Sequence, residues 1–311
     1  MCGWVACWGP GEADEAALAA LTARLAGTLR HRGPDDSGVW VDADAGLALG
    51  FRRLSIVDLS PLGPQPLLSA SGGHAFRGHS DTGVMLAAFE EWGISAALER
   101  FVGMFAIALW DRQERRLTLV RDRLGKKPLY YGGAGDTFIC GSELKALRAH
   151  PDFAPPIDRN ALALCLRHGY IPAPYTIYEG VHKLPPGALL TLGAPDSRPA
   201  PQPYWSMRAA VERGLADPLR LTDAELVEEL DALLRDAVGL RMIADVPLGA
   251  FLSGGIDSST VVALMQAQSA RPVRTFSIGF AEDKYNEATH AAAVAPHLGT
   301  AHTKLYVTPQ R

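Results

Sequence analysis

Residues 251–259 read Phe251-Leu252-Ser253-Gly254-Gly255-Ile256-Asp257-Ser258-Ser259, and this stretch decides how the C-terminal part of the chain folds. An apolar run from 246 to 252 leads into it, and residues 258–268 continue as a helix pattern. A strand, a glycine turn and a helix start, in that order, direct backbone N–H groups towards an anion. The stretch therefore predicts an anion-binding loop at the end of a strand.

The side chains of this loop suit a phosphate group with magnesium. Gly254 and Gly255 let the backbone turn tightly and approach a ligand. Asp257 is a candidate Mg²⁺ ligand, because this cation prefers a carboxylate together with phosphate oxygens. The hydroxyl donors for phosphate oxygens are those of Ser253, Ser258 and Ser259. A capped helix start would explain a lone Gly-Gly pair, and the lack of Gly-Lys-Ser/Thr argues against a Walker-type kinase loop.

Length and composition limit the other possibilities. The chain has 311 residues, which suggests two domains of about 150 residues each. Its hydrophobic content of 48% can supply ordinary cores. A net charge of -4 without a basic block argues against nucleic acid as the main partner. No apolar run is long enough to span a membrane, and the N-terminus lacks the order of a signal peptide.

The four cysteines are scattered without CxxC spacing, at Cys2, Cys7, Cys140 and Cys165. This spacing favours reduced thiols in a cytoplasmic protein over a disulfide framework or a zinc site. Cys2 stands apart, because removal of Met1 would leave it with a free α-amine. That amine, whose ordinary pKa is near neutral, could accept the thiol proton and activate the sulfur as a nucleophile. A mobile terminus with an incidental cysteine is the plainer alternative.

Periodicity and turn residues predict alternating segments along the chain. Strands are expected at residues 3–8, 38–41, 47–51, 101–110, 116–122, 128–131, 137–140, 188–192, 273–280 and 303–307. Helices are expected at residues 14–30, 82–92, 143–149, 161–167, 224–241, 258–268 and 286–298. The helix at 224–241 should begin at a cap formed by Thr222 and Asp223.

Several strings occur together in one order. They are MCG at 1–3, HRGPDDSG at 31–38, RRLSIVDLS at 52–60, GPQP at 63–66, HSDT at 79–82, RDRLGKKPLYY at 121–131, SELKAL at 142–147 and SGGIDSS at 253–259. The first seven resemble a class II glutamine amidotransferase domain. With the last, almost the whole chain resembles glutamine-hydrolysing asparagine synthetases.

The resemblance implies a fold and a division of the chain. Residues 2–157 would form an α+β glutaminase domain of the N-terminal-nucleophile hydrolase class, with stacked β-sheets and helices. Residues 158–221 would be a structured linker. Residues 222–311 would form part of an α/β doubly wound, parallel-sheet domain that binds ATP at the carboxyl ends of its strands. Only the first three strands of that sheet are expected here, so the resemblance implies a C-terminally truncated domain.

The family's activity is asparagine synthesis. Glutamine would be hydrolysed at Cys2 to supply ammonia, ATP with Mg²⁺ would adenylate aspartate, and ammonia would displace AMP. Glutamine, aspartate and ATP are thus the expected partners, and a homodimer is left open.

Residue roles follow from the matching strings. Cys2 corresponds to the nucleophile, Arg53 to the residue that holds the glutamine carboxylate, and Asp81 to the one that binds its ammonium group. The remaining glutamine-site positions are Leu54, Ser55, Ile56 and Val57. In the second domain the positions that match the ATP site are Leu252, Ser253, Gly254, Gly255, Asp257, Ser258, Ser259 and Ile278, with Leu252 and Ile278 at the adenine.

One segment of the family's pattern is missing. An Asn-Gly-Glu-Ile-Tyr-Asn segment, which supplies the oxyanion hole and part of the substrate pocket, should follow the Gln-Pro turn. Here residues 68–73 run directly into residues 74–81, and no asparagine precedes Asn160. Loss of one oxyanion donor costs about 100- to 1000-fold in rate in other acyl-transfer enzymes. We therefore expect a core strand and the following helix to be absent, and this chain to be poorly active.

Two alternatives remain open. A β-lactam-synthetase-like ligase shares the two domains, and although the missing segment favours it mildly, Cys2 argues against it. A non-catalytic nucleotide-binding pseudoenzyme also fits the gap and the truncation.

Overall fold

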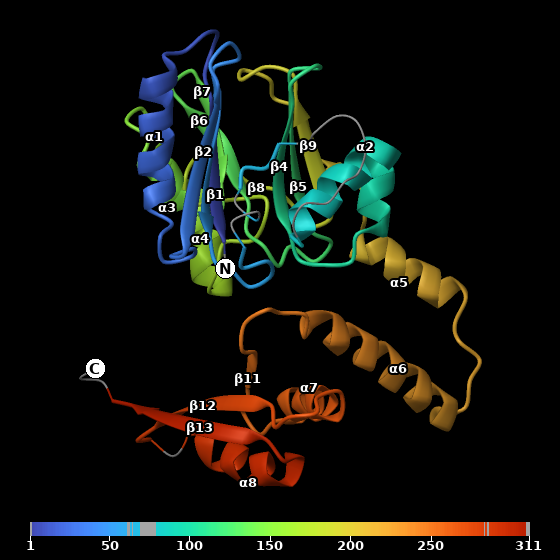
Figure 1. The fold of residues 1–311 in the computed structure, drawn as a ribbon. Helices are drawn as coiled ribbons and strands as arrows, with labels where there is room; N and C mark the ends of the chain where they lie inside the picture. The colour runs from blue at the N-terminus through green and yellow to red at the C-terminus, as the bar shows by residue number, and fades with distance from the viewer. Residues whose placement is uncertain are drawn as a thin grey trace. The chain divides into compact units, whose positions relative to one another are not determined.

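The computed structural model describes residues 2–60, 63, 65–68, 79–282, 284 and 286–308 (Figure 1). The chain forms two compact units, Met1–Asp217 and Pro218–Arg311. Each unit has its own sheets and core, and each is described by itself.

The first unit contains two antiparallel sheets and the helices that accompany them. Its strands are β1 (Gly3–Trp8), β2 (Asp36–Asp42), β3 (Leu47–Arg53), β4 (Ala106–Asp111), β5 (Arg116–Arg121), β6 (Tyr130–Ala134), β7 (Thr137–Gly141), β8 (His182–Lys183), β9 (Ala188–Leu192) and β10 (Gln202–Pro203). Its helices are α1 (Glu15–Gly27), α2 (Asp81–Arg100), α3 (Leu144–Arg148), α4 (Arg159–His168) and α5 (Met207–Ala216).

The six-stranded sheet has the order β2-β3-β1-β7-β6-β8, so β1 lies in its interior. Strand β1 is apolar throughout because both of its faces are covered. Val5 and Cys7 pack into a cluster with residues of α1 and α3, whereas Ala6 and Trp8 pack towards the second sheet. The start of β1 is therefore held on both sides.

The second sheet has the order β10-β9-β5-β4. Its buried leucines, at 117, 119, 190 and 192, share a core with Trp8 and Leu47 of the first sheet. In Figure 1, α1 covers the outer side of the first sheet and α2 lies on the outer side of the second. This layering of helix, sheet, sheet and helix is the α+β arrangement expected from the sequence.

The second unit is a parallel α/β structure, as predicted. Its elements are α6 (Asp223–Arg241), β11 (Gly249–Phe251), α7 (Ile256–Ala267), β12 (Arg274–Phe280), α8 (Ala288–Leu298) and β13 (Ala301–Val307). The sheet has the order β11-β12-β13, and both pairings are parallel. Helix α6 begins with the expected cap, a capping box in which Thr222 and Glu225 bind each other's backbone N–H.

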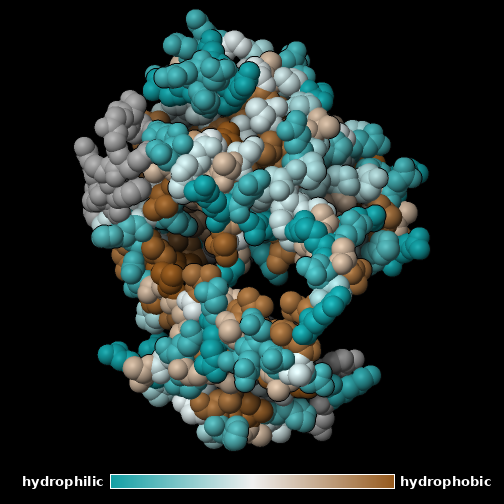
Figure 2. All heavy atoms as spheres, turned by 90° about the vertical axis from the view of Figure 1, so that its right-hand side faces the viewer, coloured by the Kyte–Doolittle hydropathy of each residue, from teal (hydrophilic) through white to brown (hydrophobic). Residues whose placement is uncertain are grey.

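One face of this sheet is open. Along β12 the buried residues Thr275 and Ser277 alternate with Phe276, Ile278 and Phe280, which are 39%, 46% and 40% exposed. Parallel sheets are ordinarily covered on both faces. Hydrophobic residues reach the surface of both units (Figure 2).

Several elements differ from the predicted ranges. Helix α2 continues past residue 92 to Arg100, with Gly93 at φ 74 marking a kink between two helical segments. Strand β4 begins at Ala106 instead of 101, because Phe101 caps α2 by donating its N–H to the carbonyl of Ala97. Helix α5 was not predicted, although Met207, Val211 and Leu215 recur at helical spacing, and none of its side chains is buried.

The segment expected to be a linker takes part in the first unit. Strand β8 pairs with β6, and β9 pairs with β5, so residues 182–192 belong to both sheets. The division at Asp217 lies near the expected start of the ATP-binding domain at 222. The boundary at 157 stays a prediction. Among the described residues, no helix combines the length and apolar character that crossing a membrane requires.

Candidate functional site

Cys2 lies at the point where β1 begins, opposite the end of β3. The register pairs Gly3 with Arg52, which brings Cys2 next to Leu54. The amide nitrogen of Leu54 donates to Cys2 Sγ at 3.4 Å, and Sγ lies 3.5 Å from the carbonyl oxygen of Leu54. Cys2 is exposed, so an electrophile can approach a sulfur atom that its neighbour already orients.

The loop after β3 is fixed by two carboxylates. The amide of Ser55 donates to Asp35 Oδ2 at 2.8 Å, which ties the RRLSIVDLS string to the HRGPDDSG string. Asp58 has a positive φ of 57° and accepts from the amides of Ser60 at 3.0 Å and His79 at 2.9 Å. Hydrogen bonds, first from the Ser60 hydroxyl and then from the His79 amide, lower the pKa of Asp58 below its ordinary value. The loop thus has a defined shape beside Cys2.

Arg53 is buried within this loop. Its Nη2 donates to the carbonyl oxygen of Val57 at 3.3 Å and also to that of Asp58. A Cβ on Gly63 would lie 2.2 Å from Arg53 Nη2, so the guanidinium packs directly against this glycine. The role of Arg53 towards a glutamine carboxylate stays a prediction.

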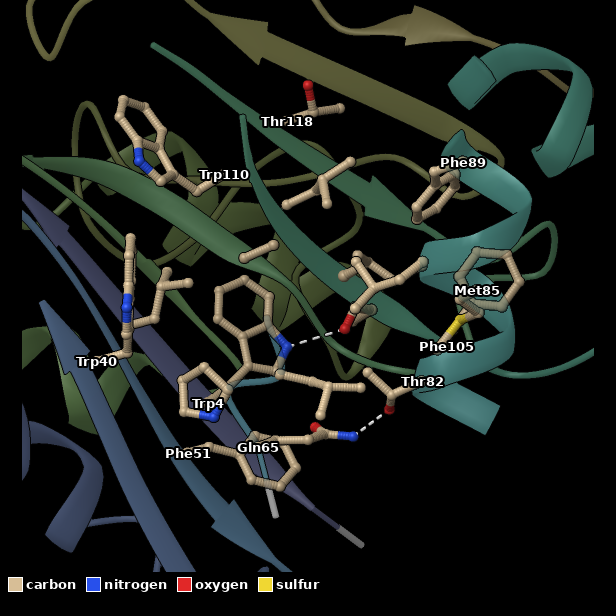
Figure 3. A pocket seen from close by; sticks show the side chains of 18 of the residues that line it. Trp4, Trp40, Phe51, Gln65, Thr82, Met85, Phe89, Phe105, Trp110 and Thr118 are labelled. Carbon is tan, nitrogen blue, oxygen red and sulfur yellow. Dashed lines mark hydrogen bonds between the residues drawn. The ribbon is translucent and has the colours of Figure 1, made fainter. Parts of the chain in front are cut away.

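Asp81 is the first residue of α2 and is exposed. The preceding Ser80 caps the helix, accepting from the amide of Thr82 at 3.3 Å. Gln65 donates through Nε2 to the Thr82 hydroxyl, which joins the GPQP string to the start of α2 (Figure 3). These contacts fix the start of α2 and so the position of the Asp81 backbone.

One cavity of about 1590 Å³ gathers most of the predicted glutamine-site residues. Those that line it are Cys2, Arg53, Leu54, Ile56, Val57 and Asp81. Ser55 does not line the cavity, and its amide is engaged with Asp35. Six of the seven residues that the sequence analysis assigned to the glutamine site therefore line one cavity.

The cavity extends between the two sheets and is strongly aromatic. Figure 3 shows Trp4, Trp40, Phe51, Phe105 and Trp110 around it, with Met85 and Phe89 from α2. Trp4 Nε1 donates to the carbonyl of Ala106 at 3.0 Å and so bridges the sheets. Ala106 to Trp110 of β4 are all only half-buried, and β4 is an edge strand among the described residues. Apolar side chains here lack the cover that the rest of the core has.

The gap predicted from the sequence adjoins this cavity. Residues 65–68, just before the gap, and 80–82, just after it, line the cavity. Residues 69–78, where the oxyanion segment was expected, lie outside the described residues.

The predicted phosphate loop of the second unit, residues 253–259, has the expected order of strand, turn and helix. Gly254 has φ 84, and a Cβ there would lie 2.8 Å from the backbone nitrogen of Ala291. The hydroxyls of Ser253 and Ser258 are 2.8 Å apart, and the amide of Gly255 donates to Ser253 Oγ at 3.3 Å. Helix α7 then begins with Gly255 as an N-cap that offers no side chain, which leaves its first amides for a ligand.

Two features of this loop fit a phosphate group. Ser259 Oγ is buried without a hydrogen-bond partner among the described residues, so it has a donor to offer. Asp257 lies exposed in the first turn of α7, where it could hold Mg²⁺ together with phosphate oxygens. The described residues contain no cluster of three or more acidic, histidine or cysteine side chains for a metal, so phosphate oxygens and water would supply the other ligands.

The two residues expected at the adenine are not brought together. Leu252 is 1% exposed and packs with Val262, Ala291 and Ala295. Ile278 is exposed on the opposite side of β12 from the buried Thr275 and Ser277. Their contact with an adenine stays a prediction.

Two residues of the motif strings are linked to Cys2 by hydrogen bonds, although the sequence analysis assigned them no functional role. Arg32, of the HRGPDDSG string, donates to the carbonyl of Cys2 at 3.0 Å, and Glu143, of the SELKAL string, accepts from Arg32 at 2.9 Å. Their position within motif strings was the only sequence signal, because a separation of 111 residues gives no hint of contact.

Comparison with protein families assigns both units. The glutamine amidotransferase domain matches residues 1–73 and 69–205, and asparagine synthase matches residues 229–311. The two amidotransferase stretches overlap at residues 69–73, which is where the sequence analysis expects the family's oxyanion segment to be missing.

Individual relatives agree. A Mycobacterium tuberculosis protein is 36% identical over 328 positions, covering 94% of this chain and 49% of the relative. Asparagine synthetase [glutamine-hydrolyzing] 1 of Bacillus subtilis is 32% identical over 337 positions, covering 100% of this chain and 51% of the relative. Against the 311 residues of this chain, those 337 positions mean that the relative has residues at 26 or more positions where this chain has none.

Among solved structures, glutamine phosphoribosylpyrophosphate amidotransferase from B. subtilis, complexed with ADP and GMP, aligns with a TM-score of 0.49 at 14% identity, covering 99% of this chain and 82% of that chain. The chain spans about half the length of the curated relatives it matches. With an amidotransferase match over most of its length, the chain belongs to the family whose members join a glutamine amidotransferase domain to an asparagine synthase domain.

Proposed function

We propose that this chain carries the glutaminase unit and the nucleotide-binding start of a glutamine-dependent asparagine synthetase. The observation that carries the proposal is the placement of Cys2 Sγ beside the Leu54 amide, in a cavity that Arg53 and Asp81 also line. A thiol, a guanidinium and a carboxylate around one space suit an amide substrate that has its own carboxylate and ammonium.

The proposed hydrolysis begins after Met1 is removed. The freed α-amine of Cys2 accepts the thiol proton, and Sγ attacks the side-chain amide carbon of glutamine. The C–N bond then breaks, the amine returns the proton to the departing nitrogen, and ammonia leaves a thioester on Cys2. Water hydrolyses the thioester and releases glutamate.

In the second unit, the proposed substrates are ATP and aspartate. The uncapped start of α7, the glycine turn and the partnerless hydroxyl of Ser259 support phosphate binding there. Asp257 would hold Mg²⁺, which neutralises phosphate charge when bound. An aspartate carboxylate attacks the α-phosphorus and pyrophosphate leaves; ammonia then attacks the acyl carbon and AMP leaves.

The gap supports low glutaminase activity for this chain. Relatives have residues at 26 or more additional positions, and the amidotransferase match divides at 69–73. Oxyanion donors contribute about 100- to 1000-fold in rate in comparable reactions. This gap also favours a second candidate, in which the first unit captures glutamine without turning it over.

Two assays separate the candidates. Glutamate release from glutamine measures the first unit, with Cys2→Ala as the control. AMP release that depends on aspartate measures the second unit. Measurable glutamate release by the unsubstituted chain that Cys2→Ala leaves unchanged would contradict the assignment of the nucleophile.

A further inference from the structure

The HRGPDDSG and SELKAL strings meet in space at the nucleophile, although the proposed chemistry uses no residue of theirs. Arg32 donates through Nε to the carbonyl oxygen of Cys2 at 3.0 Å. The same guanidinium donates through Nη1 to Glu143 Oε1 at 2.9 Å. A single planar fork therefore connects the backbone of Cys2 to the carboxylate of Glu143, the residue just before α3.

The position of Arg32 is set by close backbone approaches. A Cβ on Gly3 would lie 3.1 Å from Arg32 Cδ, so the absence of a side chain at Gly3 lets the arginine lie over the start of β1. A Cβ on Gly33 would lie 2.4 Å from the backbone of Arg52, which brings this turn directly onto β3. The Arg32 side chain is only 9% exposed, so few other geometries are open to it.

Glu143 is fixed independently of Arg32. The neighbouring Ser142 exchanges two hydrogen bonds with Trp4 of β1, at 3.0 and 3.1 Å. His31 Nε2 lies 3.0 Å from Glu143 Oε1, and Lys145 Nζ lies 3.4 Å from Oε2. Burial alone would raise the pKa of Glu143, but hydrogen bonds from Arg32 and His31 and the nearby charges outweigh it and lower this pKa. The carboxylate thus stays charged at neutral pH and keeps hold of the guanidinium.

We propose that Glu143 is a positioning residue for Cys2 and acts through Arg32. The inference rests on the proposed function, in which Cys2 is the N-terminal nucleophile. Once Met1 is removed, no preceding residue restrains Cys2, and chain termini fray unless they are tied down. The Arg32 bond to the Cys2 carbonyl supplies that restraint, and Glu143 holds Arg32 in the orientation that makes it. Sγ then stays beside the Leu54 amide.

A purely structural salt bridge would stabilise the fold without affecting how Cys2 meets a substrate. The structural role and the positioning role of Glu143 are distinguished by comparing the rates at which two electrophiles react with Cys2. A chloroketone analogue of glutamine must occupy the substrate site before Sγ displaces chloride and forms a thioether. Iodoacetamide does not have to bind the substrate site, because it reacts with any accessible thiolate: Sγ displaces its iodide and forms a thioether. Both rates are measured on Cys2 by peptide mass spectrometry of the 311-residue chain.

The cysteines of the chain provide internal references. Burial raises the pKa of the Cys7 thiol to about 12 and raises that of Cys140 as well, so both should stay unlabelled in a folded chain. Cys165 is half-buried and far from the nucleophile in sequence, and its iodoacetamide rate should be the same in every variant. Labelling of Cys7 or Cys140 would reveal unfolding.

Glu143→Gln should slow analogue capture by about tenfold, since a misplacement of about 1 Å can cost 100-fold in an oriented reaction. Its iodoacetamide rate on Cys2 should change less than twofold. Glu143→Asp, which keeps the charge, should recover part of the loss. The matched control Glu12→Gln, at an exposed loop position, should behave as the unsubstituted chain.

Capture by Glu143→Gln at the unsubstituted rate would overturn the positioning role and leave the proposed function intact. No capture by the unsubstituted chain would overturn the proposed function and this inference with it. If Glu143→Gln labels at Cys7 and has therefore unfolded, Arg32→Lys decides, because lysine keeps the charge and loses the fork. Equal capture by a folded Arg32→Lys would then overturn the inference.

Discussion

Gly254 and Ala291 are in direct backbone contact: a Cβ on Gly254 would lie 2.8 Å from the nitrogen of Ala291. Gly254 also has φ 84, a conformation that residues with a side chain rarely adopt. The predicted phosphate loop is therefore packed on the start of α8. Packing, as well as ligand approach, requires glycine at position 254.

Gly254→Ala should lower the free energy of unfolding of the second unit by about 2 kcal/mol, from the strained φ and the contact with Ala291 together. Denaturant unfolding followed by a probe in the second unit measures this loss. The adjacent Gly255→Ala is the matched control, because Gly255 has φ -74 and its nearest Cβ neighbour would be 3.4 Å away. Equal losses for the two variants would contradict the packing argument.

The sequence predicted the parts of the fold that have strong local signals. The SGGIDSS string and the apolar β1 were placed correctly because glycine turns and buried strands leave their pattern in the sequence. Helix α5 was missed although Met207, Val211 and Leu215 have helical spacing, and none of its side chains packs in a core. Arg32 and Glu143 meet only because β1, the turn at 31–33 and α3 converge, and no local pattern carries that information.

The assignment of Cys2 predicts how the terminus is processed. If its α-amine is the base, Met1 must be absent from the mature protein, because a peptide nitrogen cannot accept the thiol proton. Intact-mass measurement of the purified chain should show the loss of one methionine. A mass that includes Met1 would remove the amine from the proposed mechanism.

Asp58 predicts a pH-dependent contribution to stability. Its pKa in the folded chain is below the ordinary value of 3.8, so the folded state favours its charged form. This contribution is fully present above the unfolded pKa and is lost as the pH falls through the lower, folded pKa. Asp58→Asn should therefore lower the unfolding midpoint at pH 7, and the difference from the unsubstituted chain should shrink below about pH 4. A difference that persists unchanged in acid would rule out the charge as its source.

Asp257 predicts a metal-dependent role at the phosphate loop. We expect weak ATP binding by the 311-residue chain and a tendency to aggregate, because Phe276, Ile278 and Phe280 form an open face on the parallel sheet. In a version extended with the remaining length of a relative, Asp257→Ala should weaken binding of ATP with Mg²⁺ by roughly tenfold. Calorimetry with and without Mg²⁺ measures this, with Asp236→Ala on α6 as the control. Loss of affinity in Asp257→Ala that is equal without Mg²⁺ would contradict the metal role.

The cavity between the sheets predicts what restores glutaminase activity. It has about 1590 Å³ of space beside the edge strand β4, and residues 65–68 and 80–82 on either side of the gap line it. Inserting a relative's additional residues between Leu68 and His79 should supply a strand that pairs with the edge strand β4 and fills this space. It should also return the oxyanion donors. We expect glutamine hydrolysis to rise by at least about 100-fold and the free energy of unfolding to increase. An insertion of equal length made of glycine and serine is the control, since it cannot cover Trp110 and the other apolar lining. If the unsubstituted chain already hydrolyses glutamine as fast as the repaired one, then a group already present in this chain supplies the oxyanion donors.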